Sequence, residues 1–247
     1  DTIKVDPGLS TKILKVANSA LYARQKQVQN LQMAITLLGF KNIKSLVLLV
    51  TASNMFSKQK TSAFYQFFWK HSILNAFMAK DMAQRTGNRS ISDECFLAGL
   101  LHDIGQVALY NADTDKYDLV LDSARERATR ISAMENDLFG TNHKEVGGQV
   151  LREWNFPELY IAAAEEHGTA NITSSYKKTV LFISIADFIT SNTDIYADNP
   201  LDLGLMEDIV RQTSMNTEDL EYYQNRFIED VRDDPLFQEC QTLFQVT

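Results

Sequence analysis

The 247-residue sequence is 45% hydrophobic, which suffices for one large or two small globular domains and excludes disordered and fibrous classes. Its formal net charge of −8 argues against binding along a nucleic-acid backbone, because phosphate recognition requires clustered Lys and Arg. The two cysteines form no CxxC motif or disulfide framework, and no apolar run reaches membrane-spanning length, so we expect a cytoplasmic protein with no membrane partner.

The four prolines and ten glycines, together with few β-branched runs, favour long helices over short strands. Apolar residues recur at helical spacing along most of the chain. The predicted helices cover residues 9–20, 31–38, 43–55, 64–82, 95–110, 117–134, 143–154, 157–167 and 180–189, and the acidic remainder over 201–245 is predicted to be helical from weaker signals. Polar residues over 57–62 indicate a soft boundary. We therefore expect an all-α protein with an N-terminal helical subdomain over 1–60 and a second helical subdomain over 61–247.

Residues with capping preferences indicate where some of these helices begin. Ser92 or Asp93 is predicted to cap the helix that continues to about Tyr110. Thr141 is predicted to cap the helix that starts near residue 143, and Pro157 to be the first residue of the helix after it.

Residues 31–50 also allow a helix-turn-helix hypothesis, because Gly39 separates two short helices there. The second of these helices is largely apolar and offers only Lys41 and Lys44 to DNA. Together with the acidic net charge, this opposes DNA binding, and we do not expect a nucleic-acid partner.

All four histidines of the chain lie in predicted helices beside apolar residues. His71 follows an aromatic run. His102 and Asp103 follow a segment that is apolar nearly all round, which is typical of a buried helix. A His-Asp pair in such a position loses its hydration, at a cost in free energy unless partners or a metal replace the water.

Three further polar residues are predicted to point inward. His143 and Asp187 each share a helical face with apolar residues, and His167 ends its helix beside Glu166. Each has an ordinary explanation by itself: His167 can complement a helix dipole, and Asp187 can be a hydrogen-bonded buried acid. Together, several inward imidazoles and carboxylates are most economically satisfied by a shared cation, because both groups are good ligands for divalent transition metals.

The spacing of His71, the pair His102-Asp103 and Asp187 resembles the H…HD…D pattern of the HD superfamily of metal-dependent phosphohydrolases. Longer blocks resemble the HDOD family within it. These blocks are DPGLSTKILKVANSALY from Asp6, AITLLGF from Ala34, FWKHSILNAFMA from Phe68, FLAGLLHDIGQVAL from Phe96, and the run from Glu135 through FGTNHKEVGGQVLREWNFP to Pro157. The resemblance extends to about residue 192. HDOD sequences usually carry one more helix before the first block, so we expect further sequence upstream of Asp1.

The resemblance implies an HD-domain-like helical bundle and a role in bacterial signal transduction, often beside receiver or other sensory domains. It also implies one or two divalent transition-metal ions (Fe, Mn or Zn). By position, the first metal site would comprise His71, His102, Asp103 and Asp187. The second would comprise His143, Glu166 and His167, with Asp103 bridging the two ions as the catalytic residue.

Two departures separate this sequence from the related HD-GYP phosphodiesterases. Gln106 stands where that group has a phosphate-contacting Lys, and no GYP loop follows Gly168. Glu166 also replaces the first His of a His-His pair. Cleavage of a cyclic dinucleotide by the HD-GYP route is therefore not expected.

Two functions remain open at this point. The first, slightly favoured by Gln106, is a regulatory module whose pocket senses a ligand or whose surface binds other signalling proteins. The alternative is a phosphohydrolase acting on a phosphorylated small molecule or nucleotide. Lys70 and Lys144 each lie one residue from a predicted ligand, but both are expected to be solvated.

Overall fold

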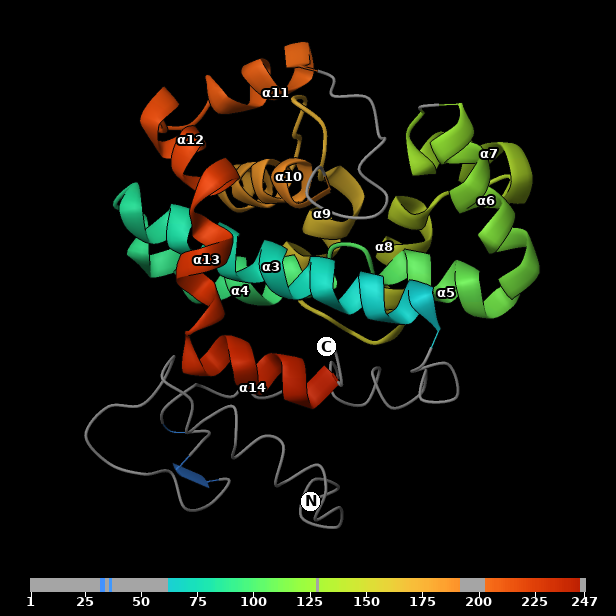
Figure 1. The fold of residues 1–247 in the computed structure, drawn as a ribbon, viewed down its shortest axis with the longest axis horizontal. Helices are drawn as coiled ribbons and strands as arrows, with labels where there is room; N and C mark the ends of the chain where they lie inside the picture. The colour runs from blue at the N-terminus through green and yellow to red at the C-terminus, as the bar shows by residue number, and fades with distance from the viewer. Residues whose placement is uncertain (1–31, 34–35, 37–61, 128, 192–202, 245–247) are drawn as a thin grey trace. The chain divides into compact units, whose positions relative to one another are not determined.

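The computed structural model describes residues 32–33, 36, 62–127, 129–191 and 203–244. Every element that the structure describes from residue 62 to residue 244 is helical (Figure 1), which confirms the all-α prediction. None of the helices described is both long and apolar enough to cross a membrane. The predicted helices over 9–20 and 43–55, most of the one over 31–38, and the helix-turn-helix alternative lie outside the described residues.

Figure 1 labels the helices by their order in the chain. They are α3 (Ala63–Arg85), the 3₁₀ turn η3 (Arg89–Ile91), α4 (Ser92–Leu101), α5 (Ile104–Ala112), α6 (Thr114–Glu126), α7 (Ile131–Phe139), α8 (His143–Glu153), α9 (Glu158–Glu166), α10 (Lys177–Ser191), α11 (Leu203–Val210), α12 (Thr217–Asn225), α13 (Phe227–Arg232) and α14 (Pro235–Phe244). The chain divides into two compact units, one of Phe67–Ile228 and one of Asp1–Gln66 with Glu229–Thr247. The boundary expected between residues 60 and 61 stays a prediction, because this stretch is not among the described residues.

Helix α3 is buried around much of its circumference, which is the position expected for a helix with apolar residues on all faces. Ala76, Met78 and Ala79 have no exposed surface. The side-chain amide of Asn75 donates to the Ile183 carbonyl oxygen on α10 at 3.3 Å. These contacts hold the His71 segment of α3 in the interior of the unit Phe67–Ile228.

A single helix predicted over 95–110 is wrong, because the chain forms two helices with His102 and Asp103 between them. Asp103 has φ −103° and ψ 13°, outside the α-helical region, and its carbonyl accepts from the Gln106 backbone N–H at 2.9 Å. Both helices are buried, so the apolar pattern continues across the break and periodicity does not reveal it. Helix α5 then approaches α8 so closely that a Cβ on Gly105 would overlap the carbonyl oxygen of His143.

Helix starts also differ from the capping predictions. The residue before α4 is Ile91, whose own side chain cannot cap that helix. Asn142 caps α8, where Thr141 was predicted, and its side-chain oxygen accepts from two backbone N–H groups of the first turn. Pro157 was predicted to be the first residue of its helix, but α9 begins at Glu158 and Pro157 is its N-cap. The segment predicted as one helix over 117–134 contains parts of two, α6 and α7, which pack against each other (Figure 1).

Candidate metal centre

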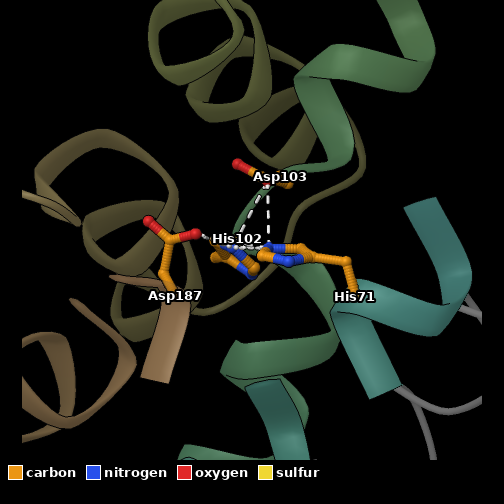
Figure 2. Close-up of side chains that lie close together, drawn as sticks. All are labelled: His71, His102, Asp103 and Asp187. Carbon is orange, nitrogen blue, oxygen red and sulfur yellow. Dashed lines mark hydrogen bonds and ion pairs between the residues drawn. The ribbon is translucent and has the colours of Figure 1, made fainter. Parts of the chain in front are cut away.

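Four side chains from α3, the α4–α5 junction and α10 converge inside the unit Phe67–Ile228 (Figure 2). His71 Nε2 lies 3.3 Å from His102 Nε2 and 3.3 Å from Asp187 Oδ1. Asp103 Oδ2 lies 3.6 Å from His71 Nε2 and 3.4 Å from His102 Nε2. Two donors that are each about 2.1 Å from one ion, at about 90–110° to each other, are roughly 3.0–3.4 Å apart. The observed separations equal these values or exceed them slightly, as expected for ligands that surround one cation.

A second group of donors meets the other oxygen of Asp103. His143, at the start of α8, places Nε2 3.5 Å from Asp103 Oδ1, and His167, just after α9, places Nε2 3.3 Å from the same oxygen. These three residues are buried. The carboxylate of Asp103 therefore lies between two groups of donors, with one oxygen facing each.

The backbone fixes which nitrogen of two imidazoles carries the proton. His102 Nδ1 lies 2.8 Å from the Gly99 carbonyl oxygen, and His167 Nδ1 lies 3.0 Å from that of Ala163. A carbonyl oxygen only accepts, so each Nδ1 donates, and in the neutral ring the lone pair is on Nε2, which faces the cluster. Asp103 Oδ1 is buried, and no described residue donates a hydrogen bond to it. When these rings are neutral, lone pairs therefore face lone pairs, and this donor set fits a divalent cation.

Glu135 contacts Nδ1 of His143, as backbone carbonyl oxygens do for His102 and His167. The sequence did not predict a role for Glu135. Its side chain is fully buried on α7, and its Oε2 lies 2.6 Å from His143 Nδ1 and accepts from the His143 backbone N–H at 2.8 Å. Its Oε1 accepts from the Tyr117 hydroxyl at 2.7 Å. The available signal was the position of an acid eight residues before a histidine, at the start of a block that resembles the HDOD family.

Glu166 is the one predicted ligand that the structure does not bring to the cluster. Its Oε1 accepts from the Thr173 hydroxyl at 2.6 Å and from the backbone N–H groups of Thr173 and Ser174 at 3.1 and 3.2 Å. The reason is local geometry, since α9 ends at Glu166 and His167 adopts an extended backbone with φ −61° and ψ 152°. The two side chains therefore leave the chain in different directions.

Neighbouring charges shift the pKa values of the cluster residues in different directions. Burial alone would lower the pKa of His102, but Asp103 and Asp187 outweigh burial and raise it to about 9. Burial would raise the pKa values of Asp103 and Asp187, yet the neighbouring imidazoles hold both below the usual range. Burial and the ammonium of Lys144 instead lower the pKa of His167 to about 4, so this ring stays neutral and able to bind a metal.

A pocket of about 120 Å³ opens beside the cluster and is lined by residues of both groups. The prediction that Lys144 is solvated is wrong: the side chain is half-buried, lines this pocket and donates from Nζ to the His167 carbonyl oxygen at 2.5 Å. Lys70 is exposed, as predicted. Gln106 also lines the pocket, and its amide donates to Asp103 Oδ2 at 2.6 Å.

Comparison with known proteins gives both a family and a fold. The family model described as HDOD domain matches residues 1–170. Among solved structures, an HDOD domain protein of unknown function from Geobacter sulfurreducens is 22% identical, with a TM-score of 0.68 over 100% of this chain and 85% of that one. A protein from Marinobacter aquaeolei VT8, provisionally named a signal transduction protein, is 19% identical, with a TM-score of 0.71 over 99% of this chain and 54% of that one.

Two further matches come from other bacteria. A protein from Shewanella amazonensis SB2B, provisionally named a phosphohydrolase, is 21% identical, with a TM-score of 0.67 over 98% of this chain and 84% of that one. An uncharacterized protein of Treponema pallidum (strain Nichols) is 23% identical over 186 residues, which are 75% of this chain and 36% of that protein. This chain therefore matches about a third of the length of its Treponema relative. At these identities, the structural likeness is one of fold.

Proposed function

The chain belongs to the HDOD domain family, and from that premise we propose that it is a signal-transduction module that binds divalent cations at the buried His/Asp cluster and senses a small ligand in the adjoining pocket. The observation that carries the proposal is the arrangement around Asp103. Imidazole Nε2 atoms lie 3.3–3.6 Å from its two oxygens on both sides. A cation would satisfy such a buried set, because unpaired acceptors are costly to bury.

Two overlapping ligand sets would hold the cations. The first is His71, His102, Asp103 and Asp187, and the second is Asp103, His143 and His167. Imidazole with carboxylate suits iron, manganese or zinc. When bound, these ions supply Lewis-acid binding of phosphate oxygens and activation of water. Glu135 would orient His143 from outside the set, as carboxylates commonly do for metal-bound histidines.

The contacts of Gln106 and Glu166 favour a sensing role over turnover. Gln106 donates its amide to Asp103 and brings no charge to the pocket. Glu166 is held by the loop at 173–174 and does not reach the second set, so that set would hold its ion less tightly than expected. The Marinobacter protein, named for signal transduction, is consistent with this role.

Hydrolysis of a phosphoester is the second candidate. The observation in its favour is that the pocket is lined by His143, His167 and Asp103, so a ligand there would meet the three-residue set directly. Sets of three protein ligands with open positions are typical of catalytic metal sites. The Shewanella protein named as a phosphohydrolase supports this alternative.

Elemental analysis of protein purified without chelator tests the shared premise. We expect one or two equivalents of iron, manganese or zinc, with at least one lost in His102→Ala, because that variant removes a ligand of the first set. Asp122→Asn, a change at an exposed acid, is the matched control and should retain all metal. A folded protein that purifies without metal and is not stabilised by added Mn²⁺, Fe²⁺ or Zn²⁺ would refute metal binding.

Assays with p-nitrophenyl phosphate then separate the two candidates. The metal-loaded sensing module should release no nitrophenol above the buffer rate. Turnover that disappears in Asp103→Asn while the melting curve stays cooperative would establish the phosphohydrolase.

A further inference from the structure

The pocket beside the cluster is lined by both charged and apolar side chains. The charged ones are cluster residues together with Arg130 and Lys144. The apolar ones are Phe67, Ile131, Phe188, Leu205, Met206 and Ile209. A volume of about 120 Å³ lies below the range of roughly 300–1,000 Å³ typical of sites for drug-sized ligands. The pocket therefore suits a compact ligand that has both a charged group and an apolar part.

Lys144 is held in this pocket by the end of α9. Its ammonium donates one hydrogen bond to the His167 carbonyl oxygen, and an ammonium has three N–H groups, so two remain for a ligand. Gly168, the next residue, has φ +66°, and a Cβ there would lie 3.3 Å from Lys144 Nζ. Glycine at 168 thus permits the turn and leaves room for the ammonium.

The balance of charge indicates that the ligand is an anion. The carboxylates of Asp103 and Asp187 face imidazoles of the cluster at 3.3–3.7 Å, so their charge is directed at the candidate cations. Lys144 and Arg130 add positive charge to the same pocket. A phosphoryl group has three terminal oxygens in a tetrahedron, so one oxygen can meet the cluster while another accepts from Lys144.

We infer that Lys144 is the phosphate-binding residue of this pocket and that the ligand is a compact organic phosphate with an apolar substituent. The inference rests on the proposed ligand site and names its chemistry. Lys144, from α8, supplies the positive charge that Gln106, bonded to Asp103, does not.

Calorimetric titration of the full chain with phenylphosphonate, a non-hydrolysable probe with a phosphoryl group on an apolar ring, tests this inference. Metal content and melting temperature are measured on each preparation. Lys144→Gln should weaken binding roughly tenfold or more, as expected for loss of a charge-assisted hydrogen bond, while Lys144→Arg should stay within about threefold of the wild type. Lys70→Gln is the matched control, since Lys70 also adjoins a cluster histidine but is exposed, and it should bind as the wild type does.

Equal affinity in Lys144→Gln and Lys70→Gln, at equal metal content, would overturn the assignment of Lys144. Absence of phenylphosphonate binding by the wild type would overturn the ligand class. If the wild type holds no metal, the proposed cation site fails separately. The same titrations on metal-free protein then still decide the inference through the difference between Lys144→Gln and Lys70→Gln.

Discussion

The cluster has two halves, the first of His71, His102, Asp103 and Asp187 and the second of Asp103, His143 and His167. They share Asp103 but hold their histidines differently. In the first half, His71 and His102 face two carboxylates, and the buried His71 Nδ1 has no hydrogen-bond partner in the part of the chain that the structure describes. In the second half, His143 and His167 face one carboxylate oxygen, while Glu135 fixes the His143 ring from behind. The first half therefore attracts a cation through charge, and the second depends more on correctly oriented neutral rings. We expect the first ion to bind more tightly.

The largest effect is expected from Asp103→Asn, which acts on both halves. The amide keeps the volume but removes the negative charge and is a poor ligand for a transition metal, so both ions should be lost. Elemental analysis and melting curves with and without Mn²⁺ or Zn²⁺ measure this loss. Asp118→Asn, at an exposed acid on α6, should bind normally. If the Asp103 variant retained a full equivalent, the shared carboxylate would not bridge the halves.

Glu135→Gln should affect the second half alone. An amide can still contact His143 Nδ1, but it loses the charge that favours the Nδ1–H form, and changes of this kind typically lower metal affinity about 10- to 100-fold. Competition with a chelator gives the affinity of each ion. Glu126→Gln, an exposed change on α6, should alter neither. An equal loss from both halves would show that Glu135 acts through general stability and not through His143.

The first half also predicts a pH dependence for the metal-free protein. The folded pKa of His102 is raised from 6.5 to about 9. His102 therefore contributes to stability at pH values below its pKa in the unfolded chain, and this contribution is lost as the pH rises through its pKa in the folded protein. The melting temperature should fall between about pH 6.5 and 9.

Controls for this pH profile follow from the neighbouring groups. The lowered pKa values of His167, Asp103 and Asp187 act at more acidic pH, outside this window. In His102→Gln the slope should become shallower, with a residual slope from His143, whose pKa is also raised because Glu135 and Asp103 outweigh burial. Added Zn²⁺ should reduce the slope in the wild type, because the cation replaces the proton. A wild-type profile as flat as that of His102→Gln would contradict the charge argument.

Sequence patterns located much of the fold because α3, α8 and α10 carry apolar residues at helical spacing. They failed at the α4–α5 break, where His102 and Asp103 interrupt a run that is buried on every side. Periodicity reports only contrast between buried and exposed faces, so a turn inside the core leaves no signal.

Local sequence patterns were also insufficient to predict every contact of the candidate site. The spacing of the histidines and of Asp187 anticipated residues that the structure brings together, and metal binding by them stays a proposal. Glu135 was missed because its burial depends on how α7 packs near α8 and α6, which no local pattern encodes. Lys144 was misjudged because only the end of α9 places a carbonyl within its reach.

Glu166→Gln carries the smallest expected effect and tests the second half most directly. If Glu166 were a ligand, as its place beside His167 predicted, the variant would lose the second ion. Because its carboxylate binds the 173–174 loop, metal content should stay unchanged and stability should fall by about 1 kcal/mol or less, the worth of a weakened, half-exposed hydrogen bond. His167→Gln, the adjacent change, should lose the second ion. Elemental analysis of the two variants side by side thus separates a ligand from its sequence neighbour, and loss of metal from both would mean that the loop at 173–174 releases Glu166 when a cation binds.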